Sequence, residues 1–544
     1  MIARILSLKT STITAAASVI AASSFASMAL GVIRDRLFAG RFGAGEELDI
    51  YLAAFRIPDV LYGIFIMGGL TAVFLPIFSE YYQRNREEAW FVTSQIFNTV
   101  LVFLVGLSLV LLATMPFLVK LITPGFDSAM QEQVTLLARI MLLSPIILGI
   151  SAVFSGVLQY FNRFFVYALA PVFYNLGIII GIIFLTPIFG LTGLAFGVLL
   201  GAAMHLAIQV IPGISSGFHW KPVLQLNHPV IKQAFTLMAP RAIGAAAFHV
   251  NLIVITALAS TLATGSIAVF YFANNIQYVP VSLIGISLAV ASFPILSRAF
   301  AKSDIEAFIF SISATFRQIL FLIVPISLML FLLRAQVVRL FLGTGEFGWL
   351  ATRLTAASLG IFAIGIIFQA FIPFLIRAFF ATKDTRTPTI VGVISIALNI
   401  VLALLFIWTF SFPNIVHNWV VFLLDLQGIE DVRIIALPFA ISFAGLVQFL
   451  LLSSLLQRKM QDGYRAEIID STKKVVIGGV VLIGVVLATI KLSSLIWDLN
   501  TFGEVLFQII LAGTVGILVY GVTMFFLKAP ELSAFSKIFD RVRK

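Results

Sequence analysis

Hydrophobic residues run through this chain in long uncharged stretches, each separated from the next by a short polar or charged segment. A helix needs about 20 mostly apolar residues to cross the hydrocarbon core of a membrane, so the stretches can be counted as spans. Two of the longest runs each contain two spans, with turns at "TPIFGLTG" and "STLATGS". The pattern predicts fourteen spanning helices, near 11–33, 48–79, 90–119, 134–161, 164–187, 190–212, 234–261, 267–297, 312–341, 354–376, 387–411, 432–457, 475–496 and 503–527.

Composition agrees with this pattern and narrows the chemistry. Hydrophobic residues make up 60% of the chain and charged residues 11%, whereas about 25% of residues are charged in a soluble domain. The fold class is therefore an all-α polytopic membrane protein. The absence of cysteine excludes disulfides and thiolate sites, and the five histidines show no metal-ligand spacing. Because the loop acids stand alone, the sequence predicts neither a catalytic constellation nor a metal site, and hence no enzyme.

The net charge of +11 does not require a nucleic-acid partner. Cytoplasmic loops of membrane proteins carry an excess of Lys and Arg, which explains a positive charge by topology. Most Lys and Arg residues fall on one side of the predicted topology. We assign that side to the cytoplasm, which places both termini there. The cytoplasmic loops are then 80–89, 159–163, 213–233, 298–317, 377–388 and 457–474.

A weak internal repeat divides the chain. "VFLPIFSEY" at 73–81 matches "SFPILSRAF" at 292–300, and Asn175 matches Asn399 at a similar separation. A period of six helices keeps both copies in the same orientation, so the repeats are parallel. We expect an N-terminal lobe at 1–218, a C-terminal lobe at 219–460, and two additional helices with a cytoplasmic tail at 461–544.

Charged side chains at membrane depth are the candidate functional residues, because each costs about 2.5–3.5 kcal/mol on insertion scales. The segment "GVIRDRLFAGRFGAGEELD" and the helix after it supply Arg34, Asp35, Asp49 and Arg56. Guanidinium groups bind phosphate through two parallel hydrogen bonds, so Arg34 and Arg56 favour a phosphate-bearing ligand. Asp35 has an alternative, purely structural role as the ion-pair partner of Arg34 or Arg56.

The corresponding part of the eighth helix is polar but uncharged, at Asn274 and Asn275. These amides either line the same site or hold helices together. Cofactors are not expected, although coupling to a monovalent cation or to the membrane potential stays open. In the second half of the chain, the candidate oxygen ligands for a cation are Asp384, Thr385 and Asn399. The segment "KDTRTP" is more simply interpreted as a cytoplasmic turn in which Asp384 caps the next helix.

Several motifs resemble one known family in order and spacing. They are "LGVIRDRLFAGRFGAGEELDIYLAAFRIPD", "FLPIFSEY", "ITPGF", "FNRF", "ATGSI", "FPILSRAF" and "RAFFATKDTRTP". Together they resemble the MurJ (MviN) family of lipid II flippases, within the multidrug/oligosaccharidyl-lipid/polysaccharide exporter superfamily, over about residues 10 to 460. The resemblance implies two lobes around a cationic cavity, a groove for the lipid tail at the last two helices, and a location in the bacterial cytoplasmic membrane.

The family's functional residues carry over in part. Its Arg-Asp pair falls on Arg34 and Asp35, its helix-2 aspartate on Asp49, and its basic residue before the helix-2 proline on Arg56. Other charged family positions are occupied here by uncharged residues, namely Met28, Tyr62, Gly63, Met67, Asn274 and Asn275. The departures bear on the substrate more than on the fold.

The predicted function is export of lipid II, an undecaprenyl-pyrophosphate glycopeptide, to the outer leaflet for cell-wall synthesis by alternating access. Its partners are this anionic peptidoglycan precursor and membrane lipid, not nucleic acid. Alternatives are a flippase for another polyprenyl-linked oligosaccharide, a cation-coupled small-molecule exporter, and a non-transporting membrane scaffold.

Overall fold

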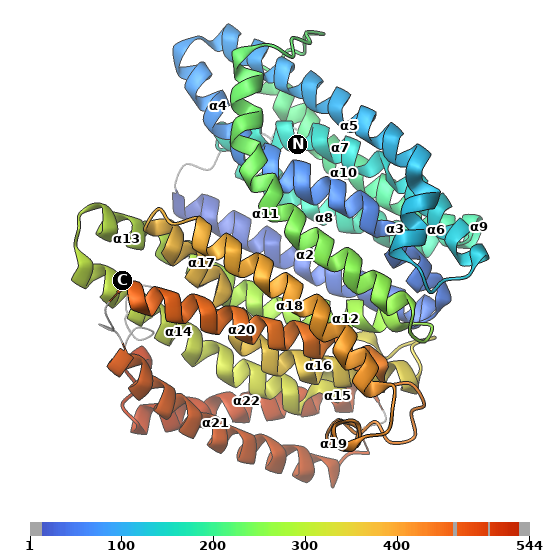
Figure 1. Cartoon of the computed structure of the whole chain (residues 1–544), viewed down its shortest axis with the longest axis vertical. Coiled ribbons are helices and arrows are strands. Elements are labelled where there is room, and N and C mark those ends of the chain that lie inside the picture. Colours follow the sequence, from blue (N-terminus) through green and yellow to red (C-terminus); the bar gives the residue numbers. More distant parts are fainter. Residues whose placement is uncertain (1–12, 461–464, 499–500, 533–544) are drawn as a thin grey trace. The chain divides into compact units, whose positions relative to one another are not determined.

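The computed structural model describes residues 13–460, 465–498 and 501–532, and helices dominate these residues (Figure 1). The chain divides into two compact units, Met1–Ile267 and Ala268–Lys544. The all-helical polytopic fold expected from the hydrophobic pattern is confirmed.

Unit 1 contains the first half of the helices. They are α2 (Ile13–Phe42), α3 (Glu46–Leu61), the π-helix η1 (Tyr62–Leu70), α4 (Thr71–Arg84), α5 (Arg86–Ile122), α6 (Ser128–Met141), α7 (Leu143–Tyr160), α8 (Phe164–Ile180), η2 (Gly181–Leu185), α9 (Thr186–Phe189), α10 (Thr192–Ser215) and α11 (Pro229–Ser260). The helix α12 (Ser266–Pro280) begins at the boundary between the units.

Unit 2 continues from α12. Its elements are η3 (Val281–Ile286), α13 (Ser287–Ala301), α14 (Ile305–Leu332), α15 (Arg334–Leu342), α16 (Trp349–Gln369), α17 (Ile372–Ala381), α18 (Arg386–Phe410), α19 (Ile415–Leu423), the 3₁₀ turn η4 (Arg433–Ile435), α20 (Ala436–Lys459), α21 (Arg465–Ser494) and α22 (Phe502–Phe526). The last two helices attach to unit 2, because α21 packs on α14 and α22 on α15.

The predicted spans can be followed one by one in the described residues. Among the residues that the structure describes, eleven helical segments are long and apolar enough to cross a membrane, and a pair bent by 51° within α11 adds a twelfth. The two remaining predicted spans fall on α2 and on the run from α3 through η1 to α4. The former carries several charges near its end, and the latter is interrupted by a π-helix and carries Arg56 and Asp59. The start of the first predicted span, at residues 11 and 12, lies outside the described residues.

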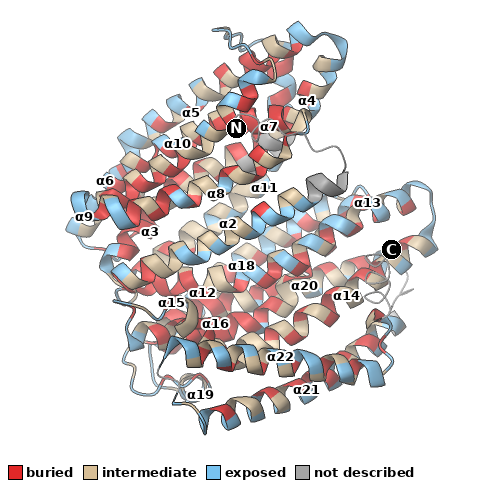
Figure 2. Cartoon of the chain, turned by 180° about the vertical axis from the view of Figure 1, so that it is seen from behind, coloured by how far each residue is buried: buried red, intermediate tan, exposed pale blue. Residues whose placement is uncertain are grey.

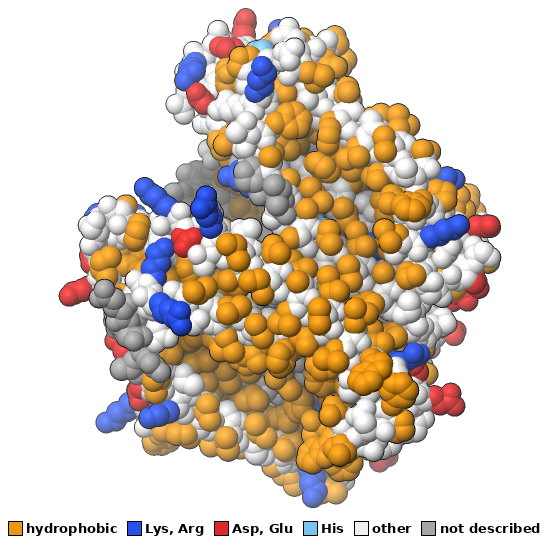
Figure 3. Space-filling model, viewed as in Figure 1, with side chains coloured by type: hydrophobic (Ala, Val, Ile, Leu, Met, Phe, Trp, Pro, Cys, Tyr) orange, Lys and Arg blue, Asp and Glu red, His pale blue; other side chains and the backbone are white. Residues whose placement is uncertain are grey.

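Apolar side chains cover the outside of the spanning helices. In α5, Leu109 and Phe117 are exposed, and in α20, Phe443 and Leu450 are exposed. Hydrophobic side chains cover α20 in Figure 3, and many helices combine an exposed with a buried face in Figure 2. Such apolar exposure suits contact with lipid, where hydrocarbon replaces water as the surrounding solvent.

Small residues bring α8 and α10 into close contact inside unit 1. A Cβ atom placed on Gly177 would overlap the Cα of Gly201, and one placed on Gly181 would overlap Gly197. Glycine lets helix backbones approach closely in a membrane, where the hydrophobic effect does not drive helix association. The close packing of α8 on α10 therefore depends on the glycines at the contact. This packing fixes the position of α8, which carries Asn175.

Corresponding turns in the two halves share one geometry. Asn162 and Lys383 both have positive φ, at 57° and 61°, and each ends a helix. The next residue donates a 6→1 hydrogen bond in both turns, from Arg163 to the Leu158 carbonyl and from Asp384 to the Phe379 carbonyl. Both turns are therefore Schellman caps, a general helix ending that also occurs at Ser303, Asp425 and Lys528.

The expected lobe boundary at residue 218 differs from the division between the compact units, because α11 packs on η1, α3, α4 and α5 of unit 1. The lobes at 1–218 and 219–460, and the separate C-terminal segment 461–544, rest on the repeat and stay a prediction.

Candidate functional site

Arg34 lies at the centre of a polar cluster between α2 and α8. Its Nε and Nη2 atoms donate to Asp35 Oδ1 at 3.1 and 2.8 Å, and Nη1 donates to Asn175 Oδ1 at 3.0 Å. The side chains of Arg34 and Asp35 are 19% and 13% exposed. The guanidinium is thus held in one orientation and is partly accessible. Of the two arginines expected as ion-pair partners of Asp35, Arg34 forms the ion pair.

Asn175 connects this cluster to a second contact on α2. Its Nδ2 donates to Ser27 Oγ at 3.2 Å and to the Pro171 carbonyl at 3.2 Å. The amide therefore uses its oxygen for Arg34 and its nitrogen for Ser27 and its own helix. From the sequence, Asn175 was identified only as a marker of the repeat. Its contact with Arg34 spans 141 residues and has no local signal.

Arg56 lies in a second cluster, between α3 and α11. Its Nε donates to Thr256 Oγ1 at 2.8 Å, and nearby Asp59 Oδ2 lies 3.8 Å from His249 Nδ1. Thr256 and His249 are functional candidates that sequence reasoning missed. They lie about 200 residues from α3, so no motif spacing could have revealed them. Arg34 bonds Asp35 and Asn175, whereas Arg56 bonds Thr256.

Asp49 has a structural contact in unit 1. Its side chain is buried in the first turn of α3, and Oδ2 accepts a hydrogen bond of 2.7 Å from the Gly265 N–H. Gly265 has φ of +87°, and a Cβ there would overlap the Ala44 carbonyl oxygen. The carboxylate therefore fixes the loop that enters α12. A direct contact of Asp49 with substrate stays a prediction from the resemblance.

Asn274 and Asn275 lie on α12 in unit 2, in a separate unit from the four charged candidates. The Asn274 Oδ1 atom accepts a hydrogen bond of 3.0 Å from Gln277 Nε2, one turn later. This contact fits a role in holding the helix surface together. A role for either asparagine in substrate binding stays a prediction.

The "KDTRTP" turn has the capping geometry that the sequence favoured. Asp384 Oδ1 accepts from the Thr387 N–H at 3.1 Å, Oδ2 accepts from Thr387 Oγ1 at 3.0 Å, and Lys459 Nζ lies 3.4 Å from Oδ2. The backbone hydrogen bond from Thr387 is the main cause that lowers the pKa of Asp384 below its usual 3.8. The described residues contain no group of three or more potential metal ligands.

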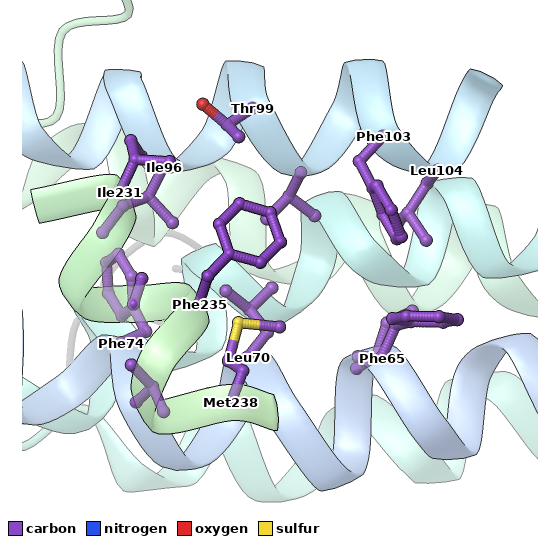
Figure 4. A pocket seen from close by; sticks show the side chains of 14 residues that line it. Phe65, Leu70, Phe74, Ile96, Thr99, Phe103, Leu104, Ile231, Phe235 and Met238 are labelled. Atoms are coloured by element: carbon purple, nitrogen blue, oxygen red, sulfur yellow. The ribbon is translucent and has the colours of Figure 1, made fainter. Parts of the chain in front are cut away.

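An apolar cavity of about 40 Å³ lies elsewhere in unit 1, between η1, α4, α5 and α11. Figure 4 shows Phe65, Phe103, Phe235 and Met238 on its walls. Thr99 is its one polar wall residue, so it has no group that would bind a phosphate.

Comparisons with known proteins identify this architecture. A solved structure titled "Lipid II flippase MurJ, inward closed conformation" aligns with a TM-score of 0.73 at 23% identity, over 94% of this chain and 98% of that one. An inward-facing multidrug resistance MATE transporter of the MOP superfamily aligns with a TM-score of 0.64 at 17% identity, over 80% and 96% of the two chains. The chain therefore shares the helical fold of these two proteins.

The family follows from the sequence. The family described as "Lipid II flippase MurJ" matches residues 38–508. A probable lipid II flippase MurJ of Rhizobium tropici is 29% identical over 397 residues, which cover 70% of this chain and 73% of the relative. The chain belongs to the MurJ family of lipid II flippases, as the motifs predicted.

Proposed function

We propose that this protein exports lipid-linked peptidoglycan precursor, lipid II, from the inner to the outer leaflet of the bacterial cytoplasmic membrane, with both termini in the cytoplasm. The observation that carries the proposal is the oriented, partly exposed Arg34 guanidinium in a chain of the MurJ family. The protein then acts as a transporter without a catalytic step.

Arg34 binds the pyrophosphate in this proposal. A phosphate oxygen pair matches the guanidinium fork, and it competes with the Asp35 carboxylate for the same N–H groups. Asp35 holds the guanidinium ready when no substrate is bound, and it favours release after transport. Arg56 adds a second positive charge, fixed by Thr256.

The membrane potential can drive export without ATP. The chain contains no P-loop motif, and an inside-negative potential favours outward movement of negative charge by about 2.3 kcal/mol per charge per 100 mV. Two phosphates therefore provide a driving force of several kcal/mol at ordinary potentials. Alternating access couples this force to exposure of the head group outside.

The alternative of a cation-coupled small-molecule exporter has less support in unit 1. Such an exporter needs membrane-depth carboxylates that can bind a cation. Asp35 contacts Arg34, Asp49 contacts Gly265, and Asp59 lies near His249. Each acid therefore already has a partner within the protein.

Complementation tests the proposal. After depletion of the host flippase, we expect the wild-type chain to restore outward exposure of lipid II. Arg34→Ala should abolish this activity and Arg34→Lys should restore little of it, because a point charge lacks the bidentate geometry. Arg139→Ala removes an exposed arginine on α6 and is the matched control. Full activity of an Arg34→Ala chain that inserts normally would refute the role of Arg34.

A further inference from the structure

Unit 1 contains a second, larger cavity whose walls are partly polar. Its volume is about 330 Å³, at the lower end of the range of about 300–1,000 Å³ typical of small-molecule sites. It lies between α2, η1, α7, α8 and α10. Its polar walls come from Ser24, Ser27, Tyr62, Ser155, Tyr167 and His205, and no charged residue lines it.

A buried hydrogen-bond network fixes the inner wall of this cavity. Ser151 Oγ lies 2.8 Å from His205 Nδ1, Gln209 Nε2 donates to Ser151 Oγ at 2.8 Å, and Ser155 Oγ donates to Gln209 Oε1 at 2.6 Å. Ser151 and Gln209 are fully buried. Because Ser151 occupies Nδ1, the second ring nitrogen of His205, Nε2, is the one available to a ligand.

Hydroxyl groups form the rest of the polar wall. No hydrogen bond within the described part of the chain involves the hydroxyl of Ser24, Tyr62 or Tyr167. Each hydroxyl can donate and accept, and a tyrosine ring also offers an apolar face. Neutral donors and acceptors beside aromatic faces suit a sugar, whose hydroxyl and amide groups lie around a partly apolar ring.

The cavity is connected to the candidate phosphate site through a single side chain. Ser27 lines the cavity and accepts a hydrogen bond from Asn175, which in turn accepts one from Arg34. A group bound at Arg34 and a group bound in the cavity are therefore close neighbours. In a polyprenyl-pyrophosphate glycolipid, the group next to the pyrophosphate is a sugar.

We propose that this cavity of unit 1 is a subsite for the sugar joined to the pyrophosphate of the transported lipid. This proposal rests on the proposed function and extends it to recognition of the glycan. A cation would require carboxylates in the wall, and a polyprenyl chain would require walls as apolar as those in Figure 4. The polar groups of the larger cavity meet neither requirement.

Binding to two lipids in detergent or nanodiscs tests the subsite on the full-length protein. The lipids are lipid II and undecaprenyl pyrophosphate, which shares the pyrophosphate and tail but lacks the sugars. The double variant Tyr62→Phe/Tyr167→Phe removes two hydroxyls and keeps both rings. We expect affinity for lipid II to fall about tenfold, the loss of two ordinary hydrogen bonds, and affinity for undecaprenyl pyrophosphate to stay within about twofold.

Tyr160→Phe is the matched control, because Tyr160 packs in the aromatic cluster with Phe78 and Tyr82 and does not line the cavity. Unchanged binding of both lipids by the double variant, or an equal loss for both, would overturn the subsite. Failure of the proposed function has a different signature. In that case the wild-type chain binds neither lipid, or Arg34→Ala binds both as the wild type does.

Discussion

Asn175→Ala separates the positioning of Arg34 from its charge. The substitution removes the Oδ1 acceptor 3.0 Å from Arg34 Nη1 and the donor 3.2 Å from Ser27 Oγ. Arg34 keeps its charge and its bonds to Asp35. If Asn175 orients the guanidinium, ligand binding must weaken although no charge is lost.

The magnitude follows from the environment of these bonds. Interhelical polar contacts in membranes contribute about 0.6 kcal/mol on average and about 1.7 kcal/mol at most. Arg34 is partly exposed and retains Asp35, so the variant leaves no uncompensated buried charge. Two lost contacts therefore predict about 1–2 kcal/mol, which corresponds to roughly a tenfold loss of lipid II affinity.

Direct binding of lipid II to purified protein measures this effect, with thermal unfolding of the same samples. Asn98→Ala is the control, because Asn98 is buried in α5 and bonds the carbonyls of Lys221 and Val223. We expect Asn98→Ala to lower thermal stability and leave the affinity of the folded fraction unchanged. Equal affinities for the two variants would refute a positioning role for Asn175.

Three further predictions test the fold. Gly177→Ala should strongly lower the thermal unfolding temperature, because the added Cβ overlaps α10. Gly106→Ala is the control, since its Cβ would meet no neighbouring helix within 4 Å, and it should be neutral or slightly stabilising. Equal effects of the two variants would contradict the packing argument. Gly265→Ala should destabilise unit 1 through strain at positive φ and disruption of the Asp49 contact, and normal unfolding would contradict it. The lowered pKa of Asp384 predicts a stabilisation that is present in full above pH 3.8 and is lost as pH falls through the folded-state pKa. Asp384→Asn should therefore show a smaller acid-induced drop in unfolding temperature than the wild type. Identical pH profiles would exclude a stabilising role for the ionised Asp384 cap.

Sequence reasoning located the charged candidates but not their partners. The sequence offered Arg34 and Arg56 as partners of Asp35, and the structure shows the pair with Arg34. Thr256 and His249 could not, because α11 reaches α3 only after about 200 residues of intervening chain. Ser155 and His205 carry no motif either, and only the packing of α7 on α10 makes them two walls of one cavity.

The sequence by itself determined the fold class, the positions of most spans and the family. These properties depend on hydrophobic runs of membrane length and on short motifs, and both are local along the chain. Tertiary structure decided which polar groups meet: Arg34 with Asn175, Asp49 with Gly265, and the hydroxyls around the larger cavity. The physical reason is that a polar side chain in a membrane protein must find its partner across helix contacts, and these contacts depend on packing shape, which the order of residues along the chain does not display.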